Sequence, residues 1–196
     1  MEKEKWKTET IILREVRLGF PNLFVPVVNA QYPTQTAAYT AQFEIVKGSA
    51  NDKILNDAIV KVVKELHGAK ADKKLAEYKP NKMKYPVKDG DDMEKDWAKG
   101  KLFLTARLRK DLGQPKVIEA YKVDDKFPSI NSNDDRIVSG AIVTAKVVIS
   151  AQPGLNDGVR CQLQVVQYLK AGEGYAQDFD DSDFEEIDVA DTDGLI

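Results

Sequence analysis

The sequence predicts a mainly β fold in which antiparallel strands form one closed or nearly closed barrel with a helix packed against it. Alternation of apolar and polar residues, the period of a half-buried strand, recurs at 39–46, 102–109, 141–151 and 159–169. One further stretch, 52–66, has apolar residues at three- and four-residue spacing, which is the period of an amphipathic helix. The strand-rich pattern favours a barrel over a parallel sheet with crossover helices.

The first part of the chain supplies an opening strand and the helix. Residues 10–18 mix apolar and charged side chains at strand-like spacing, and a Phe-Pro pair then leads into an extended segment. Ser49 or Asn51 can cap the start of the predicted helix, and Gly68 can end it. One apolar stripe of the helix is expected to plug an end of the barrel. The stripe consists of Ile54, Leu55, Ala58, Ile59, Val62, Val63 and Leu66.

The rest of the chain alternates long connections with strands. Residues 68–100 form a polar, lysine-rich excursion with a short helical piece at 70–78, and long excursions in compact domains are often functional. A short strand is expected at 116–121 and a loop at 124–136. The PGLNDG segment between the last two alternating runs is typical of a hairpin loop. The strand at 102–109 has two faces, with Leu102, Leu104, Ala106 and Leu108 on one and Phe103, Thr105, Arg107 and Arg109 on the other.

Charge is divided unevenly along the chain. The formal net charge is −3, but all 29 Lys and Arg residues lie at or before Lys170. Ten of the 32 acidic residues follow Lys170, so residues 1–170 carry +7 and residues 171–196 carry −10. The acidic end has few apolar groups and no basic ones. We therefore expect a binding domain at 1–172 and a disordered acidic tail at 173–196.

The sequence lacks the residues of several enzyme classes. One His and one Cys, far apart, exclude the usual His-based triad and a Cys/His zinc site; Cys161 falls in an apolar-alternating run and is expected to be buried. No P-loop, dinucleotide fingerprint or membrane-length apolar run occurs. A carboxylate metal site at Asp89, Asp91 and Asp92 is an alternative to a solvated turn. We expect a cytoplasmic protein that is not an enzyme and uses no cofactor or metal.

The residues that are present suit a nucleic-acid strand. Binders that ignore sequence combine a positive groove for phosphates with aromatic faces on which bases stack. Phe103 shares a strand face with Arg107 and Arg109, which favours binding, whereas the alternative is that Phe103 packs under the helix or a loop. Trp97 is a further candidate for stacking on a base; the alternative is that its ring covers the core as a lid. For each lysine in this region, the alternative is an ordinary solvent-exposed surface residue. The other candidate DNA contacts in and next to the excursion are Lys82, Lys84, Tyr85, Lys88, Lys99 and Lys101.

The acidic tail suggests a regulatory role. A flexible polyanion tethered to a cationic groove can occupy that groove until DNA displaces it, at an effective concentration that depends on the tether. Phe179, Phe184, Leu195 and Ile196 give the tail apolar anchors for partner proteins. A purely solubilising tail would need no such anchors.

Several segments together resemble the phage-encoded single-stranded DNA-binding proteins with an OB-fold. The matching stretches are LGFPNLFVP at 18–26, AYTAQFEIVKG at 38–48, YPVKDGDD at 85–92, KGKLFLTARLRKDLGQPKVIE at 99–119, VSGAIVTAKVVIS at 138–150, GVRCQLQVVQYLKAGE at 158–173 and the acidic end. The resemblance implies a five-stranded antiparallel OB-fold barrel with one or two helices, a setting in DNA replication, recombination or repair, and a tail that recruits replication proteins. Two departures are a tail that ends in Leu195-Ile196 rather than an aromatic residue, and a helix that precedes the third strand.

The residues and the resemblance together predict sequence-independent binding of single-stranded DNA. The expected partners are single-stranded DNA and, through the tail, a replication protein such as DNA polymerase; no membrane partner is expected, and a homodimer is left open. Three alternatives are an acidic DNA-mimic or inhibitor, a carboxylate-dependent nuclease or other nucleic-acid enzyme, and a structural or assembly protein with an OB-like barrel.

Overall fold

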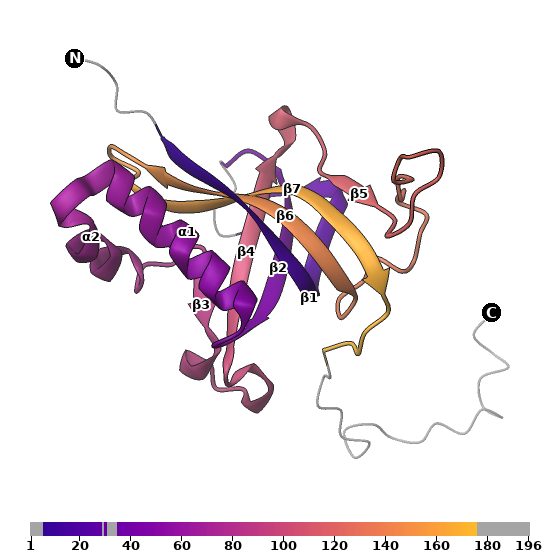
Figure 1. Cartoon of the computed structure of the whole chain (residues 1–196), viewed down its shortest axis with the longest axis horizontal. Coiled ribbons are helices and arrows are strands. Elements are labelled where there is room, and N and C mark those ends of the chain that lie inside the picture. Colours follow the sequence, from indigo (N-terminus) through magenta and orange to yellow (C-terminus); the bar gives the residue numbers. More distant parts are fainter. Residues whose placement is uncertain (1–5, 29, 31–34, 176–196) are drawn as a thin grey trace, which may run out of the picture.

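The computed structural model describes residues 6–28, 30 and 35–175. Its strands are β1 (Lys7–Val27), β2 (Ala38–Val46), β3 (Val87–Asp89), β4 (Lys101–Arg109), β5 (Lys116–Ile118), β6 (Ile142–Gln152) and β7 (Gly158–Lys170). Two α-helices, α1 (Ala50–His67) and α2 (Ala71–Tyr78), follow β2, and short 3-10 turns occupy Gly68–Lys70, Gly90–Asp92, Asp96–Ala98 and Lys110–Leu112. Every predicted strand and both predicted helices are therefore present (Figure 1).

Five strands form the barrel in the order β4-β2-β1-β6-β7, and a pairing between Arg107 of β4 and Gln162 of β7 closes it. Four of the five neighbouring pairs are antiparallel, as predicted, and the closing pair is parallel. Strand direction cannot alternate all the way around a ring with an odd number of members, so one parallel pair is unavoidable. This arrangement confirms the predicted five-stranded OB-fold barrel.

Strand β1 is long because it serves both halves of the barrel. Residues 7–17 pair with β6, and residues 17–27 pair with β2. The strand bends at two bulges, where Glu15 and Phe20 take positive φ values of 52° and 45°. Bulges of this kind increase the local twist and redirect side chains, which allows a single strand to turn the corner of a barrel.

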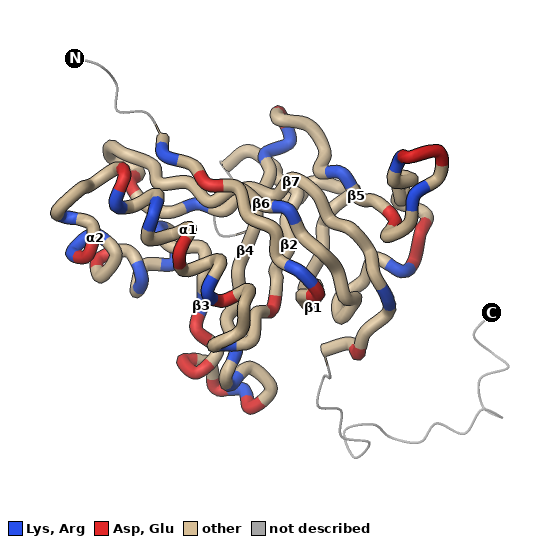
Figure 2. Tube along the Cα trace, viewed as in Figure 1, with Lys and Arg blue, Asp and Glu red and all other residues tan. Residues whose placement is uncertain are grey.

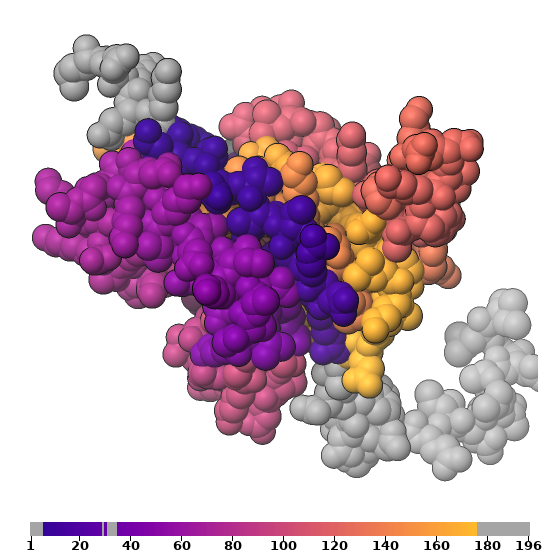
Figure 3. Space-filling model, in the orientation of Figure 1, coloured from indigo at the N-terminus to yellow at the C-terminus, as the bar shows by residue number. Residues whose placement is uncertain are grey.

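Helix α1 packs against β1 and β6 (Figures 1 and 3). The hydroxyl of Ser49 accepts a hydrogen bond from the backbone N–H of Asp52, and Gly68, with φ of 54°, ends the helix. Five residues of the predicted stripe are buried, but Ile54 is 40% exposed, because it lies at the edge of the stripe. The helix precedes β4, the third strand of the barrel, as the sequence predicted. No helix in the described part of the chain is both long and apolar enough to span a membrane.

The barrel interior is filled by alternate residues of all five strands. Leu18, Phe43 and Leu104 are paired across β1, β2 and β4 and are completely buried. Cys161 is also buried, as predicted, and burial raises the pKa of its thiol. Because these residues point inward, the residues between them point to the outer surface of the β1-β2-β4 sheet.

Candidate nucleic-acid interface

The outer surface of β1, β2 and β4, here called the outer face, is organised in rows across the strands. Arg17 of β1 lies opposite Glu44 of β2, Glu44 lies opposite Phe103 of β4, and Phe103 lies opposite Lys88 of β3. Directly paired residues point to the same side of a sheet, so these four side chains form one row. The neighbouring rows contain Gly19, Gln42 and Thr105, and then Asn22, Thr40 and Arg107.

Phe103 lies on the predicted side of β4, but its ring is not accessible. The side chain is only 1% exposed, because the indole of Trp97 packs edge-on against it with ring centroids 5.6 Å apart. The prediction of Phe103 as an exposed stacking platform is therefore wrong, and the alternative of packing under a loop is correct. Trp97 is itself half-buried and forms the accessible surface above Phe103.

Contacts within the segment between β3 and β4 hold Trp97 in this place. Gly90 lies so close to the backbone of Ala98 that an added Cβ would be 1.9 Å from the carbonyl oxygen of Ala98. Asp91 Oδ1 accepts a hydrogen bond from the backbone N–H of Gly100, at 2.6 Å. Asp89 and Asp91 also form ion pairs with Lys47. These two carboxylates therefore act as turn and ion-pair residues, and the described residues include no cluster of three or more metal-binding side chains.

The start of the predicted tail crosses the outer face. The guanidinium of Arg17 donates hydrogen bonds to the carbonyl oxygens of Glu173 and Gly174. Tyr175, the last described residue, stacks on Phe20 with ring centroids 5.7 Å apart and an interplanar angle of 5°. Its ring also lies 5.3 Å from that of Trp97 and 4.5 Å from the guanidinium carbon of Arg17. Residues 173–175 thus pack against the barrel.

A buried carboxylate lies in the middle of the outer face. Glu44 has a side-chain exposure of 9% and forms ion pairs with Lys101, at 2.9 Å, and with Arg17, at 3.7 Å. Burial, together with the negative charge of Glu44, raises the pKa of Tyr175 to about 12. Glu44 Oε2, which forms the ion pair with Arg17, and the hydroxyl of Tyr175 both lack a hydrogen bond of ordinary geometry among the described residues.

Arg107 and Arg109 lie towards the other end of β4. Arg107 is half-buried, and its Nη1 donates a hydrogen bond to Gln35 Oε1 at 3.4 Å. Arg109 is exposed and forms an ion pair with Asp111, which lowers the pKa of that carboxyl. Arg107 has no carboxylate partner among the described residues, so its charge is the less neutralised of the two.

The structure does not bring the remaining predicted lysines together on the outer face. Lys88 is exposed in the row of Phe103, whereas Lys99 is exposed and paired with Asp96 at 2.7 Å. Lys82 is exposed in the turn after α2. Figure 2 shows positive and negative residues interspersed along the segment 68–100, so its lysines do not form a continuous positive strip.

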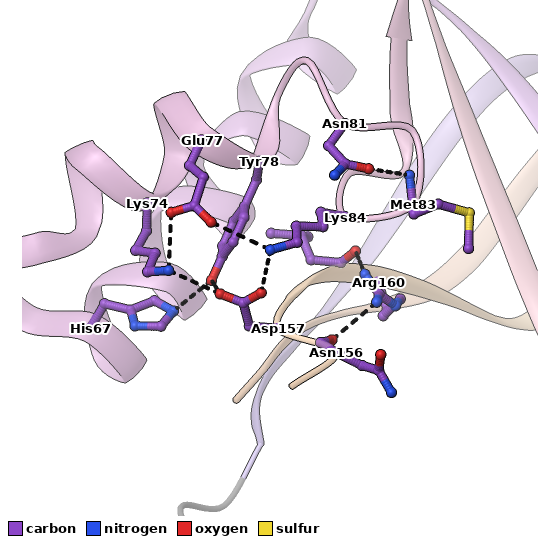
Figure 4. Close-up of polar contacts among 11 residues, drawn as sticks. His67, Lys74, Glu77, Tyr78, Asn81, Met83, Lys84, Asn156, Asp157 and Arg160 are labelled. Atoms are coloured by element: carbon purple, nitrogen blue, oxygen red, sulfur yellow. Dashed lines mark hydrogen bonds and ion pairs between the residues drawn. The ribbon is translucent and has the colours of Figure 1, made fainter. Parts of the chain in front are cut away.

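Lys84 and Tyr85 lie on the helical side of the barrel. Lys84 Nζ binds Asp157 Oδ1 at 2.6 Å and Glu77 Oε1 at 3.3 Å (Figure 4). Tyr85 is packed against the core, and burial raises its pKa to about 12. Both residues are predicted DNA contacts, but their partners lie in α2, the β6–β7 hairpin and the core, and neither residue belongs to the rows of the outer face.

The sequence interpretation missed Arg17, Phe20 and Tyr175. The Phe-Pro pair predicts that the first strand ends at Phe20, but the strand continues through Phe20 with a bulge, and the ring is 62% exposed. The charge pattern places Tyr175 in the predicted disordered tail at 173–196, whereas the structure packs its ring against Phe20. The available signal was the segment AGEGY, which places one aromatic residue after two glycines and directly beyond the last strand. The predicted tail anchors Phe179, Phe184, Leu195 and Ile196 lie outside the described residues.

Comparisons with known proteins agree with this architecture. The model of the family described as Enterobacter phage Enc34, ssDNA-binding protein, matches residues 9–195. Protein p50 of Acyrthosiphon pisum secondary endosymbiont phage 1 is 32% identical over 184 residues, which cover 87% of this chain and 92% of that protein.

Solved structures show the same fold. A C-terminal truncation of the single-stranded DNA-binding protein from bacteriophage Enc34 has a TM-score of 0.62 at 19% identity, covering 85% of this chain and 88% of that chain. Gp2.5, a single-stranded DNA-binding protein encoded by bacteriophage T7, has a TM-score of 0.52 at 15% identity, covering 91% and 96%. The match over residues 9–195 shows that the chain belongs to the family of the Enc34 phage ssDNA-binding protein.

Proposed function

We propose that this protein binds single-stranded DNA without sequence preference, through the outer face of β1, β2 and β4. The observation that carries the proposal is the arrangement of aromatic planes and guanidinium groups on one sheet surface of an OB-fold barrel. Phe20, Trp97 and Tyr175 lie beside Arg17 there, and Arg107 follows on the same face. Such a surface binds bases by stacking and phosphates by charge, and neither interaction requires a particular sequence.

The family supports the same function. Its model carries the name of a single-stranded DNA-binding protein, and one structural neighbour with a TM-score of 0.54 is the Enc34 protein in complex with ssDNA. Within the outer face, the side chains proposed to contact DNA are Arg17, Phe20, Lys88, Trp97, Lys101, Arg107 and Arg109. Lys82 and Lys99 are exposed and are proposed as peripheral phosphate contacts.

The finer parts of the proposal concern the tail and the biological setting. We place the DNA-binding domain at 1–172 and the acidic tail at 173–196, and we propose that the tail competes with DNA for the outer face. The tail would also recruit a replication protein such as DNA polymerase, with Phe179, Phe184 and the terminal Leu195-Ile196 as anchors. The setting would be phage DNA replication, recombination or repair in the bacterial cytoplasm. The protein would act by binding, without catalysis, as a monomer or a homodimer.

Fluorescence anisotropy with a labelled oligothymidine tests the central proposal. We expect saturable binding that weakens as salt rises, because cationic side chains release counterions from the strand. Unlabelled single-stranded DNA of mixed sequence should compete, and duplex DNA should compete poorly. No binding, or a strong preference for one sequence, would contradict the proposal. Incubation of labelled DNA with divalent metal ions tests the nuclease alternative, which predicts cleavage products.

A further inference from the structure

A ring-sized slot lies on the outer face, and the side chain of Tyr175 fills it. Gly19 forms the floor of this slot. Its φ is not in the positive range, so the backbone at this position accepts any L residue. A Cβ, however, would lie 3.1 Å from the hydroxyl oxygen of Tyr175 and 3.4 Å from its Cε2. Glycine is therefore the residue here that leaves room for a flat ring to lie directly on the strand.

The walls of the slot consist of groups that stack on planar rings. Phe20 is parallel to the ring of Tyr175, Trp97 is inclined to it by 55°, and the guanidinium of Arg17 lies over it. Phe20 has no part in the core, since it is 62% exposed, yet it is held at a positive φ that disfavours bulky side chains. Backbone strain that holds an exposed aromatic ring in one place is typical of a binding site.

The polar edge of the slot is incompletely satisfied when Tyr175 occupies it. Glu44 Oε2 and the hydroxyl of Tyr175 are both buried, and neither makes a hydrogen bond of ordinary geometry within the described part of the chain. The hydroxyl interacts with the carboxylate of Glu44, and Oε2 has a long ion pair with Arg17 at 3.7 Å. Buried polar atoms of this kind cost free energy, and each one calls for a missing partner. A nucleobase carries ring or amino N–H groups on its edge, and these groups could donate to Glu44 Oε2.

We propose that this slot is a nucleobase-binding subsite, and that Tyr175 occupies it in the DNA-free protein as an internal substitute for a base. The inference rests on the proposed function and adds a specific element to it. Entry of a base requires the ring of Tyr175 to leave, and its departure also releases the carbonyls of Glu173 and Gly174 from Arg17. DNA binding is thereby coupled to release of the chain that leads into the acidic tail. This coupling depends on ring contacts, which salt screens much less than it screens the charges of the tail.

Substitutions in the full-length chain test the subsite. Tyr175→Ala empties the slot and should tighten oligothymidine binding by roughly 5- to 160-fold, the scale of one stacked ring, at both low and high salt. Tyr175→Phe is the matched control, because it keeps the ring and removes only the unsatisfied hydroxyl, so its affinity should equal that of the wild type or be lower. Phe20→Ala removes a wall and should weaken binding in the Tyr175→Ala background. In the wild type the effect should be smaller, because Phe20 also stacks on Tyr175 in the DNA-free state.

A photocrosslink reports where the base lies. An oligonucleotide with 5-iododeoxyuridine should crosslink to Phe20 or Trp97, and more efficiently in Tyr175→Ala than in the wild type. If the wild type binds DNA but Tyr175→Ala and Phe20→Ala leave affinity and crosslinks unchanged, the subsite is wrong while the proposed function stands. Weaker binding by Tyr175→Ala would show that Tyr175 contacts DNA itself, and would overturn its role as a substitute. Absence of binding by every protein, including the wild type, would refute the proposed function.

Discussion

Asp157 joins three parts of the fold, and Asp157→Asn should lower the stability of the barrel. Its Oδ1 accepts from Lys84 at 2.6 Å, and its Oδ2 accepts from Lys74 and from the buried hydroxyl of Tyr78, each at 3.0 Å (Figure 4). The network connects α2, the turn before β3 and the β6–β7 hairpin. An amide would keep the shape of the side chain but would place an N–H₂ donor against a lysine or a hydroxyl donor.

The size of the effect follows from the pKa of Asp157. Burial alone would raise this pKa, but hydrogen bonds from Lys84, Lys74 and Tyr78 lower it from 3.8 to about 2. One pKa unit corresponds to about 1.4 kcal/mol, so the shift corresponds to roughly 2 kcal/mol in favour of the folded, charged form. Glu77 still pairs with both lysines after the substitution. We therefore expect a loss of about 1–2 kcal/mol in the free energy of unfolding at neutral pH.

The pH dependence gives the prediction a second test. Because the pKa is lower in the folded state, the stabilisation is complete above the unfolded-state pKa and disappears as pH falls through the folded-state pKa. The difference between wild type and Asp157→Asn, measured by urea unfolding, should shrink between about pH 4 and pH 2. Asp135→Asn, at an exposed position, is the matched control and should change little. A difference that stayed constant over this range would refute the electrostatic explanation, and a change in oligothymidine affinity at neutral pH would refute the structural assignment of Lys84.

Three other predictions concern the outer face and the tail. Arg107→Ala should weaken DNA binding and reduce the salt slope by roughly 0.7, the value for one phosphate contact on a single strand, as a salt titration of affinity would show. Phe103→Ala should destabilise the barrel by about 3–5 kcal/mol, because the ring is buried under Trp97; a thermal melt unchanged from the wild type would contradict this. Deletion of residues 176–196, which contain nine acids and leave Tyr175 in place, should tighten binding most at low salt, and equal affinities at all salt concentrations would show that the acidic segment does not compete.

Most of the barrel could be predicted because each strand carries its own periodic signal. The alternation at 102–109 places Leu104 inside and Arg107 outside, and the structure confirms both positions. The apolar stripe of α1 likewise predicted the helix and most of its buried side. Local patterns could not reveal that β1 is shared by both halves of the barrel, because that property depends on bulges at Glu15 and Phe20.

The candidate site was less predictable, because accessibility depends on segments that are distant in sequence. Periodicity assigned Phe103 to the correct side of β4, but the residue that covers it comes from a loop whose path depends on the close contact of Gly90 with Ala98. The charge of Lys84 suggested a phosphate contact, but its partner Asp157 lies 73 residues away in the chain. A sequence shows which side chains are charged or aromatic, whereas their neighbours in space determine which of them are free to bind.

Arg17 and Tyr175 contribute differently to the competition between the chain end and DNA. Arg17 holds the DNA-free arrangement through the carbonyls of Glu173 and Gly174, and the same guanidinium would be available to a base or phosphate once these carbonyls leave. Substitution of Arg17 thus removes favourable contacts from both states, and its effects on affinity oppose each other. Tyr175 stabilises only the DNA-free state if the slot belongs to a base. The sign of the affinity change at Tyr175, rather than its size, therefore distinguishes a displaced ring from a ring that contacts DNA.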